Sequence, residues 1–158
     1  MDRIGVVDTM FARVDMGSIA ENRLAGMEGF GERFKAVRRT VPGIRDLAVA
    51  CRQLIERENC EVVLACGMPG GDDLDRIRAH EASQGIMMAQ VLAGKHVLEA
   101  FVHAQEEPDP VKVTELCRQR VGAHAVNAYW LLYAPEELRK RAGQGVRQGG
   151  PDAGPLPG

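Results

Sequence analysis

Apolar and polar residues follow two different periods along the chain, and these periods separate expected strands from expected helices. Four short runs are largely apolar and have the length of buried strands: 3–8, 34–40, 61–66 and 95–102. Longer stretches carry apolar residues every three or four positions, as amphipathic helices do: 15–27, 44–58, 72–94, 111–133 and a short segment at 135–142. The run 61–66 is apolar almost throughout, so we expect it to be a central strand.

Strands that alternate with helices predict an α/β fold. Strands that are apolar on both faces are typical of a parallel sheet covered by helices on each side, which gives a three-layer αβα architecture. Right-handed crossovers then favour a doubly wound, flavodoxin-like sheet with the strand order 2-1-3-4. We expect one α/β domain at 1–142, followed by a Gly- and Pro-rich tail at 143–158 that has no apolar periodicity.

Length and charge narrow the functional classes. A chain of 158 residues is long enough for one domain with a real core, and its formal net charge of -2 is spread over interspersed signs. These features do not indicate binding to nucleic acid or to a membrane surface, and no apolar run approaches the roughly 20 residues that span a bilayer. The N-terminus runs directly into the first expected strand, so we expect no signal peptide and a cytoplasmic location.

The four cysteines are expected to be buried, reduced thiols. Cys51, Cys60, Cys66 and Cys117 all lie among apolar residues and none forms a CxxC pair. Their spacing does not match a zinc site. A nucleophilic role for Cys51 or Cys66 is the alternative, but no neighbouring pattern supports it.

The loops that follow the strands are where we expect a ligand. Parallel α/β sheets bind ligands beyond the carboxyl ends of their strands. Here those loops are 8–15, 40–46, 67–71 and 103–106, and much of the polar and Gly-rich sequence gathers in them. The loop at 67–71 does not have the Lys-Ser/Thr ending of a P-loop, and no GxGxxG follows the first strand, so neither nucleotide motif is present.

Two of these loops contain residues suited to a planar, polar ligand. Phe11, beside Arg13, would suit stacking on a planar ring, although ordinary packing is the simpler interpretation. Pro42 and Gly43 predict a turn before a helix. Backbone N–H groups at such a helix start can bind polar atoms of a ligand, but the turn can also have no role in binding.

Titratable residues offer weaker signals. His80 and Glu81 could transfer protons, but a histidine in a partly apolar helix is more often structural. His103 with the acidic pair 106–107 could bind a metal, but solvated loop charge is the simpler interpretation. The acidic run 72–75 is more typical of helix capping than of a metal site. We assign no metal ligand, and a requirement for a divalent ion such as Mg²⁺ does not follow from the sequence.

Six segments, in order and over essentially the whole chain, resemble the archaeal type of riboflavin synthase. They are 7–16, 39–44, 67–70, 79–83, 101–103 and 143–155, where the last segment lies in the otherwise unpatterned tail. This family is similar to lumazine synthase in fold. The resemblance therefore implies a lumazine synthase-like fold, a homopentamer with sites between neighbouring subunits, and a transferase that needs no organic cofactor. The implied reaction converts two 6,7-dimethyl-8-ribityllumazine molecules into riboflavin and 5-amino-6-(D-ribitylamino)uracil.

The resemblance also implies roles for individual residues. Phe11 matches an aromatic residue that stacks on the heterocycle, and the turn 41–43 matches one that lies against the ribityl chain. The expected substrate-binding residues are Thr9, Phe11, Ala12, Thr40, Val41, Pro42, Gly43, Ile44, Asp46, Gly67, Met68, Pro69, Glu99, His103, Arg147, Gln148 and Asp152. We expect His80 and Glu81 to transfer protons. We expect an adjacent subunit to contribute Glu99 and His103 and the tail residues Arg147, Gln148 and Asp152.

Two other functions stay open at this point. Lumazine synthase would need a phosphate site, and its catalytic histidine early in the third helix has no counterpart in the acidic run 72–75. A non-catalytic protein that binds lumazine or flavin would keep Phe11 and the turns but would not need His80 or Glu81.

Overall fold

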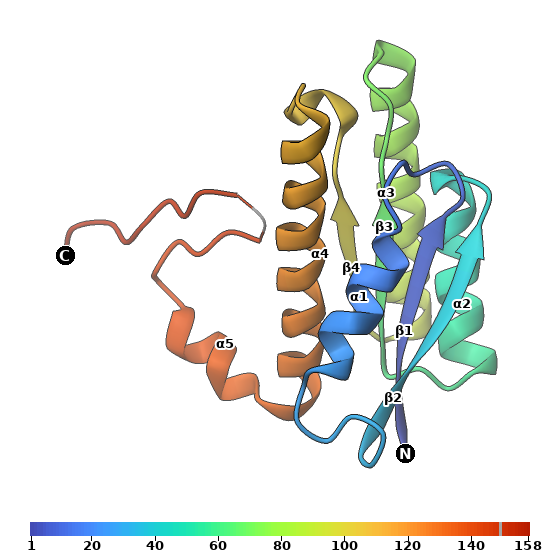
Figure 1. Ribbon diagram of the computed structural model, residues 1–158. Coiled ribbons are helices and arrows are strands. Elements are labelled where there is room, and N and C mark those ends of the chain that lie inside the picture. The colour runs from blue at the N-terminus through green and yellow to red at the C-terminus, as the bar shows by residue number, and fades with distance from the viewer. Residues whose placement is uncertain (149) are drawn as a thin grey trace.

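The protein is built around one four-stranded parallel sheet. The computed structural model describes residues 1–148 and 150–158. The strands are β1 (Asp2–Thr9), β2 (Phe34–Val41), β3 (Val62–Gly67) and β4 (Val97–Phe101), and they lie in the order β2-β1-β3-β4 (Figure 1). The expected α/β class and the strand order 2-1-3-4 are therefore confirmed.

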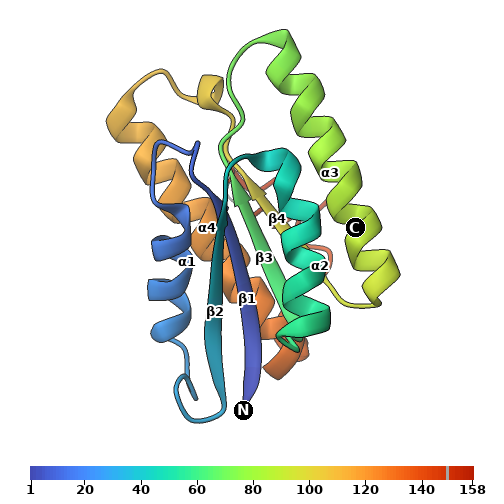
Figure 2. The same cartoon turned by 90° about the vertical axis from the view of Figure 1, so that its right-hand side faces the viewer.

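Helices cover both faces of this sheet. The helices are α1 (Met16–Ala25), α2 (Leu47–Arg57), α3 (Asp73–Ala93), α4 (Pro110–Tyr133) and α5 (Pro135–Arg141). Helices α1 and α4 pack together on one face, and α2 and α3 pack together on the other (Figure 2). The expected helix at 44–58 begins instead with a 3-10 turn, Ile44–Asp46, and a second such turn, Ala104–Glu106, follows β4.

The strands contribute alternate side chains to two cores. Ile4, Val6 and Leu64 belong to the core under α1 and α4, whereas Val7 and Val63 belong to the core under α2 and α3. This alternation follows from the pleat of a strand, which points successive side chains to opposite faces. Every residue of β3 is buried, as expected for a central strand.

Helix α5 and the tail lie outside the three layers. Figure 1 shows them beside α4, on the side of that helix that faces away from the sheet. In the described part of the chain, no helix combines the length and hydropathy required to cross a bilayer.

All four cysteines are buried free thiols, as expected. Burial raises the pKa of Cys51 to about 12 and the pKa of Cys60 and Cys117 to about 11, and it raises the pKa of Cys66 as well.

We therefore expect almost no reaction of the native protein with a disulfide thiol reagent at pH 8, because only about 0.1% of a thiol with a pKa near 11 is then the reactive thiolate. Absorbance of the released thiol should show four reactive groups per chain in denaturant. Rapid labelling of one cysteine in the native protein would contradict this expectation.

Candidate active site

A cavity of about 380 Å³ lies at the carboxyl end of the sheet, where the topology places a ligand. Its size falls within the range of about 300–1,000 Å³ that is usual for small-molecule sites. The loops after the first three strands and the first turns of α3 supply its walls. The lining residues are Phe11, Pro42, Gly43, Ile44, Arg45, Asp46, Met68, Pro69, Gly70, Asp75 and Arg78.

Phe11 stands at the rim of this cavity, in the loop after β1. The residue is 67% exposed and belongs to neither core. An aromatic ring in that position offers a face on which a planar heterocycle can stack. The structure therefore favours a role in binding over ordinary packing.

The turn after β2 forms the next wall. Val41 packs against the core beneath it, and the carbonyl of Val41 accepts a hydrogen bond from the N–H of Met10 at 2.8 Å. This bond ties the loop after β1 to the turn. The N–H of Gly43 donates to the Asp46 carboxylate at 3.1 Å, which orders the turn before α2 begins. Pro42, Gly43 and Asp46, all of which were expected to bind substrate, line the cavity.

The loop after β3 supplies the remaining apolar wall through Met68 and Pro69. Gly67, just before them, does not line the cavity but allows its walls to meet. A Cβ atom at this glycine would lie 2.8 Å from Cγ2 of Ile44 and 2.9 Å from Cε1 of Phe101. Glycine is therefore needed because it lets the turn after β2 come close to the end of β3.

The charges of the lining balance one another. Arg45 and Arg78 contribute two positive charges, and Asp46 and Asp75 contribute two negative ones. Arg78 lies 3.7 Å from Asp75, and Arg45 lies 3.6 Å from Glu81 on α3. Such a lining suits a polar, uncharged ligand better than a strongly anionic one.

Sequence reasoning missed four lining residues: Arg45, Gly70, Asp75 and Arg78. Arg45 and Gly70 lie within the loops where a ligand was expected, so they could have been included. Asp75 and Arg78 lie three residues apart on α3, and that spacing places both on one face of a helix.

Three expected residues support the cavity and do not line it. Thr9 is buried, and its hydroxyl accepts a hydrogen bond from the N–H of Ala12 at 3.3 Å. Ala12 packs against the core under α1 and α4. The hydroxyl of Thr40 donates to Asp8 at 2.7 Å. These residues shape the loop that carries Phe11.

The expected proton-transfer residues lie outside the cavity of one chain. His80 is exposed on α3, and its Nε2 lies 3.2 Å from the side-chain nitrogen of Gln84. Glu81 is also exposed and faces Arg45. Neither residue contacts this cavity within a single chain, so their role stays a prediction.

Two other expected residues, on and just after β4, also lie apart from the cavity. The half-buried carboxylate of Glu99 accepts a hydrogen bond from Ser83 at 2.8 Å, and burial raises the pKa of Glu99. The N–H of His103 donates to Glu106 at 2.8 Å. Arg120 forms two hydrogen bonds of 2.7 Å with Glu106 and holds the pKa of that carboxylate below its usual value. Glu106 is thus paired with an arginine.

The expected tail residues do not line the cavity of their own chain. Arg147 and Gln148 line a second hollow, which also includes Trp130 of α4. The N–H of Arg147 donates to Asp152 at 2.9 Å. Across residues 1–148 and 150–158, no group of three or more His, Cys, Asp or Glu side chains is arranged to hold a metal ion, so we assign no metal-binding residue.

Comparison with known proteins agrees with this arrangement. The family model described as 6,7-dimethyl-8-ribityllumazine synthase matches residues 2–132. A protein named riboflavin synthase from Methanothermobacter thermautotrophicus is 48% identical over 156 residues, which cover 99% of this chain and 100% of that protein. A protein of the same name from Aeropyrum pernix is 42% identical over 158 residues, 97% of each chain. The chain therefore belongs to the 6,7-dimethyl-8-ribityllumazine synthase family and, within it, to the group that contains the archaeal riboflavin synthases.

Proposed function

We propose that this chain is a riboflavin synthase that converts two molecules of 6,7-dimethyl-8-ribityllumazine into riboflavin and 5-amino-6-(D-ribitylamino)uracil. The observation that carries the proposal is the cavity beneath an exposed Phe11, in a chain nearly half identical from end to end to proteins named riboflavin synthase. An uncharged lumazine suits the volume and the balanced charge of that cavity.

The reaction requires little chemistry from the protein. One lumazine gives a four-carbon unit to the other, and the two products together contain all the atoms of the two substrates. The reaction therefore needs no oxidant, and we propose that it needs no organic cofactor. Holding two reactants in one site can by itself supply effective molarities of about 10⁵ M or more. General acid–base catalysis typically adds about 10²–10⁴ in rate.

The cavity can bind and orient one substrate. We propose that Phe11 stacks on the heterocycle and that Pro42, Gly43 and Asp46, which line the same cavity, contact the ribityl chain. Because the charges of the lining balance, the hydroxyl groups of an uncharged polyol would bind there with little electrostatic cost. Met68 belongs to the apolar part of the lining.

The reaction needs a place for a second substrate beside the first. We propose that a neighbouring copy supplies its walls in a ring-shaped homo-oligomer, most simply a homopentamer. Arg147, Gln148 and Asp152, in a tail that extends away from the body of its own chain, would then reach the adjacent site (Figure 1). His80 and Glu81 are proposed to transfer protons in the assembled enzyme, which we place in the cytoplasm.

The structure favours this function over lumazine synthase, which must bind a phosphate ester. The first turn of α3 faces the cavity, but two carboxylates at this helix end already accept hydrogen bonds from two of its N–H groups. Asp72 accepts a hydrogen bond from the N–H of Asp75 at 2.7 Å, and Asp75 accepts one from the N–H of Asp72 at 3.4 Å. Both carboxylates would repel a phosphate at that helix end.

Mixing the purified protein with 6,7-dimethyl-8-ribityllumazine alone tests the proposal. We expect riboflavin to form well above a protein-free blank, with one ribitylaminouracil released for each riboflavin, as followed by absorbance and fluorescence. Tight binding without turnover would instead support a lumazine- or flavin-binding protein. Lumazine formed from ribitylaminouracil and dihydroxybutanone phosphate would support lumazine synthase. A parallel assay with and without a chelator would show whether Mg²⁺ is required.

A further inference from the structure

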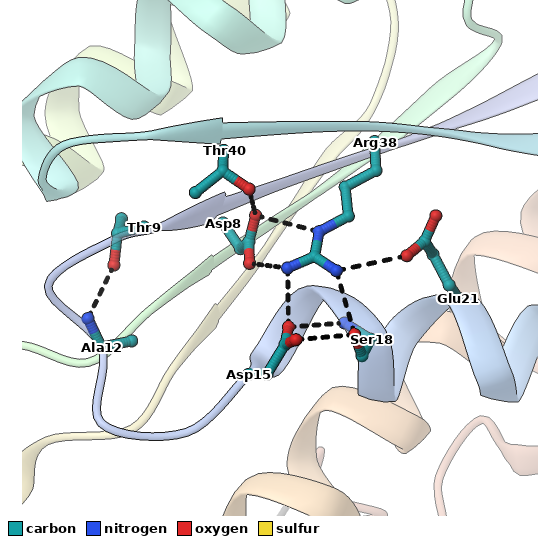
Figure 3. Close-up of polar contacts among 8 residues, drawn as sticks. All are labelled: Asp8, Thr9, Ala12, Asp15, Ser18, Glu21, Arg38 and Thr40. Carbon is teal, nitrogen blue, oxygen red and sulfur yellow. Dashed lines mark hydrogen bonds and ion pairs between the residues drawn. The ribbon is translucent and has the colours of Figure 1, made fainter.

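One guanidinium group joins the two ends of the loop that carries Phe11. Asp8, near the end of β1, is only 3% exposed, and its carboxylate accepts hydrogen bonds from Nη2 of Arg38 at 2.5 Å and from Nε at 3.3 Å. The same Nη2 donates to Asp15 at 2.6 Å. Asp15 is the residue that caps the N-terminus of α1. Figure 3 shows Arg38 between these two carboxylates, with the loop passing around them.

The guanidinium group of Arg38 has a complete set of hydrogen-bond acceptors. Its Nη1 donates to Ser18 at 3.0 Å and to Glu21 at 3.3 Å, so each of the five N–H groups of the guanidinium has an acceptor. Gly17, in the first turn of α1, leaves room for it, because a Cβ atom there would lie 2.3 Å from Nε of Arg38. Such a complete set of partners fixes the guanidinium in one place.

Arg38 does not line the cavity, but the loop that it holds does. Phe11 is largely exposed, so few contacts of its own determine where its ring lies. Its place therefore depends on the ends of the loop, on the bond between Thr9 and Ala12, and on the bond from Met10 to β2. Arg38 controls the two ends because it binds the residues just before and just after the loop.

We propose that Arg38 is a positioning residue for the reaction, which holds Phe11 at the rim of the cavity through Asp8 and Asp15. This role rests on the proposed function only in that Phe11 is taken to stack on the substrate. Small displacements of a reacting ring reduce the rate strongly, and about 1 Å of misplacement can cost on the order of 10²-fold.

The substitution Arg38→Lys tests the role, because it retains the charge beside Asp8 but loses the planar fork that binds two carboxylates at once. Retained charge matters, since removal of the cation would leave Asp8 buried and unpaired. We expect kcat/KM to fall about tenfold in the otherwise unchanged chain and less than about twofold in the Phe11→Ala background. The non-additivity arises because Arg38 acts through Phe11.

Arg3→Lys is the matched control. Arg3 is also half-buried, and it binds the carbonyl and carboxylate of Glu58 at the opposite end of β1. We expect this variant to lower the melting temperature to a similar degree and to leave kcat/KM unchanged. Equal losses of kcat/KM for Arg38→Lys in both backgrounds would show a structural role only and would overturn the proposal. Full activity of Arg38→Lys in the otherwise unchanged chain would overturn it as well.

Gly17→Ala provides a second variant that changes no charge. The added methyl group would displace the guanidinium, while alanine favours the helix and so helps to preserve the fold. We expect the same tenfold fall in kcat/KM, again abolished in the Phe11→Ala background. Retention of full activity would contradict the proposal.

Cleavage by trypsin after Arg13 measures the loop without any substrate. Arg13 is exposed within the loop, so more frequent local opening of the loop should give faster cleavage after Arg13. We expect cleavage to be about fivefold faster or more in Arg38→Lys and unchanged in Arg3→Lys. Mass spectrometry would identify the cleavage site. If the parent protein had no turnover, the proposed function would fail, while unchanged cleavage in Arg38→Lys would separately show that Arg38 does not hold the loop.

Discussion

Replacing Phe11 with alanine is expected to lower kcat/KM for 6,7-dimethyl-8-ribityllumazine by about 10–100-fold while the protein stays folded. Stacking of an aromatic side chain on a heterocyclic base contributes about 1–3 kcal/mol, which corresponds to a factor of about 5–150 and so includes the expected loss. Because Phe11 is 67% exposed, its removal costs little of the apolar burial that stabilises the fold. Steady-state kinetics, together with the melting temperature, would measure both effects.

Met10→Ala is the control for this change. Met10 lies next to Phe11 in the same loop and is 76% exposed, but it does not line the cavity. We expect Met10→Ala to leave kcat/KM within about twofold, and Phe11→Tyr to retain most of the activity because tyrosine keeps the ring. If Phe11→Ala were as active as Met10→Ala, stacking on Phe11 would have to be abandoned.

Removing residues 143–158 is expected to reduce turnover by at least about 10²-fold while the three-layer domain still folds. The tail lies outside the sheet and its covering helices, so its loss leaves both cores complete (Figure 1). If Arg147, Gln148 and Asp152 complete the site of a neighbour, the truncated chain lacks part of every active site. Full turnover by the truncated chain would contradict a role for the tail.

Mixed oligomers would separate a shared site from a simple loss of stability. We would unfold the truncated chain and the Phe11→Ala chain together and refold them at equal concentrations. If each site takes its loop from one subunit and its tail from the next, roughly a quarter of the sites regain both intact parts. Activity should then exceed the sum of the two separately refolded variants. No gain in activity from oligomers that contain both chains would exclude the shared site.

Local patterns were sufficient to predict the elements and the arrangement of the sheet. The period of apolar residues located the strands and helices to within a few residues, and the nearly uniform run at 61–66 identified β3 as a central strand. The handedness of crossovers then left the order 2-1-3-4 as the simplest choice. That order places the ligand loops at one edge, so the turn 41–43 and the loop of Phe11 could be assigned to the site in advance.

The tertiary structure alone decided which side chains of those loops face the cavity. Thr9 and Thr40, which were expected to bind substrate, do not line the cavity of one chain and form hydrogen bonds with Ala12 and Asp8, while Asp75 and Arg78 line the cavity from a helix. The contacts of Arg38 could not be predicted from the sequence either, because its partner Asp8 is 30 residues away in the chain. Periodicity reports which face of an element is buried. It does not report which distant charges meet there, because that depends on register, helix placement and the reach of each side chain.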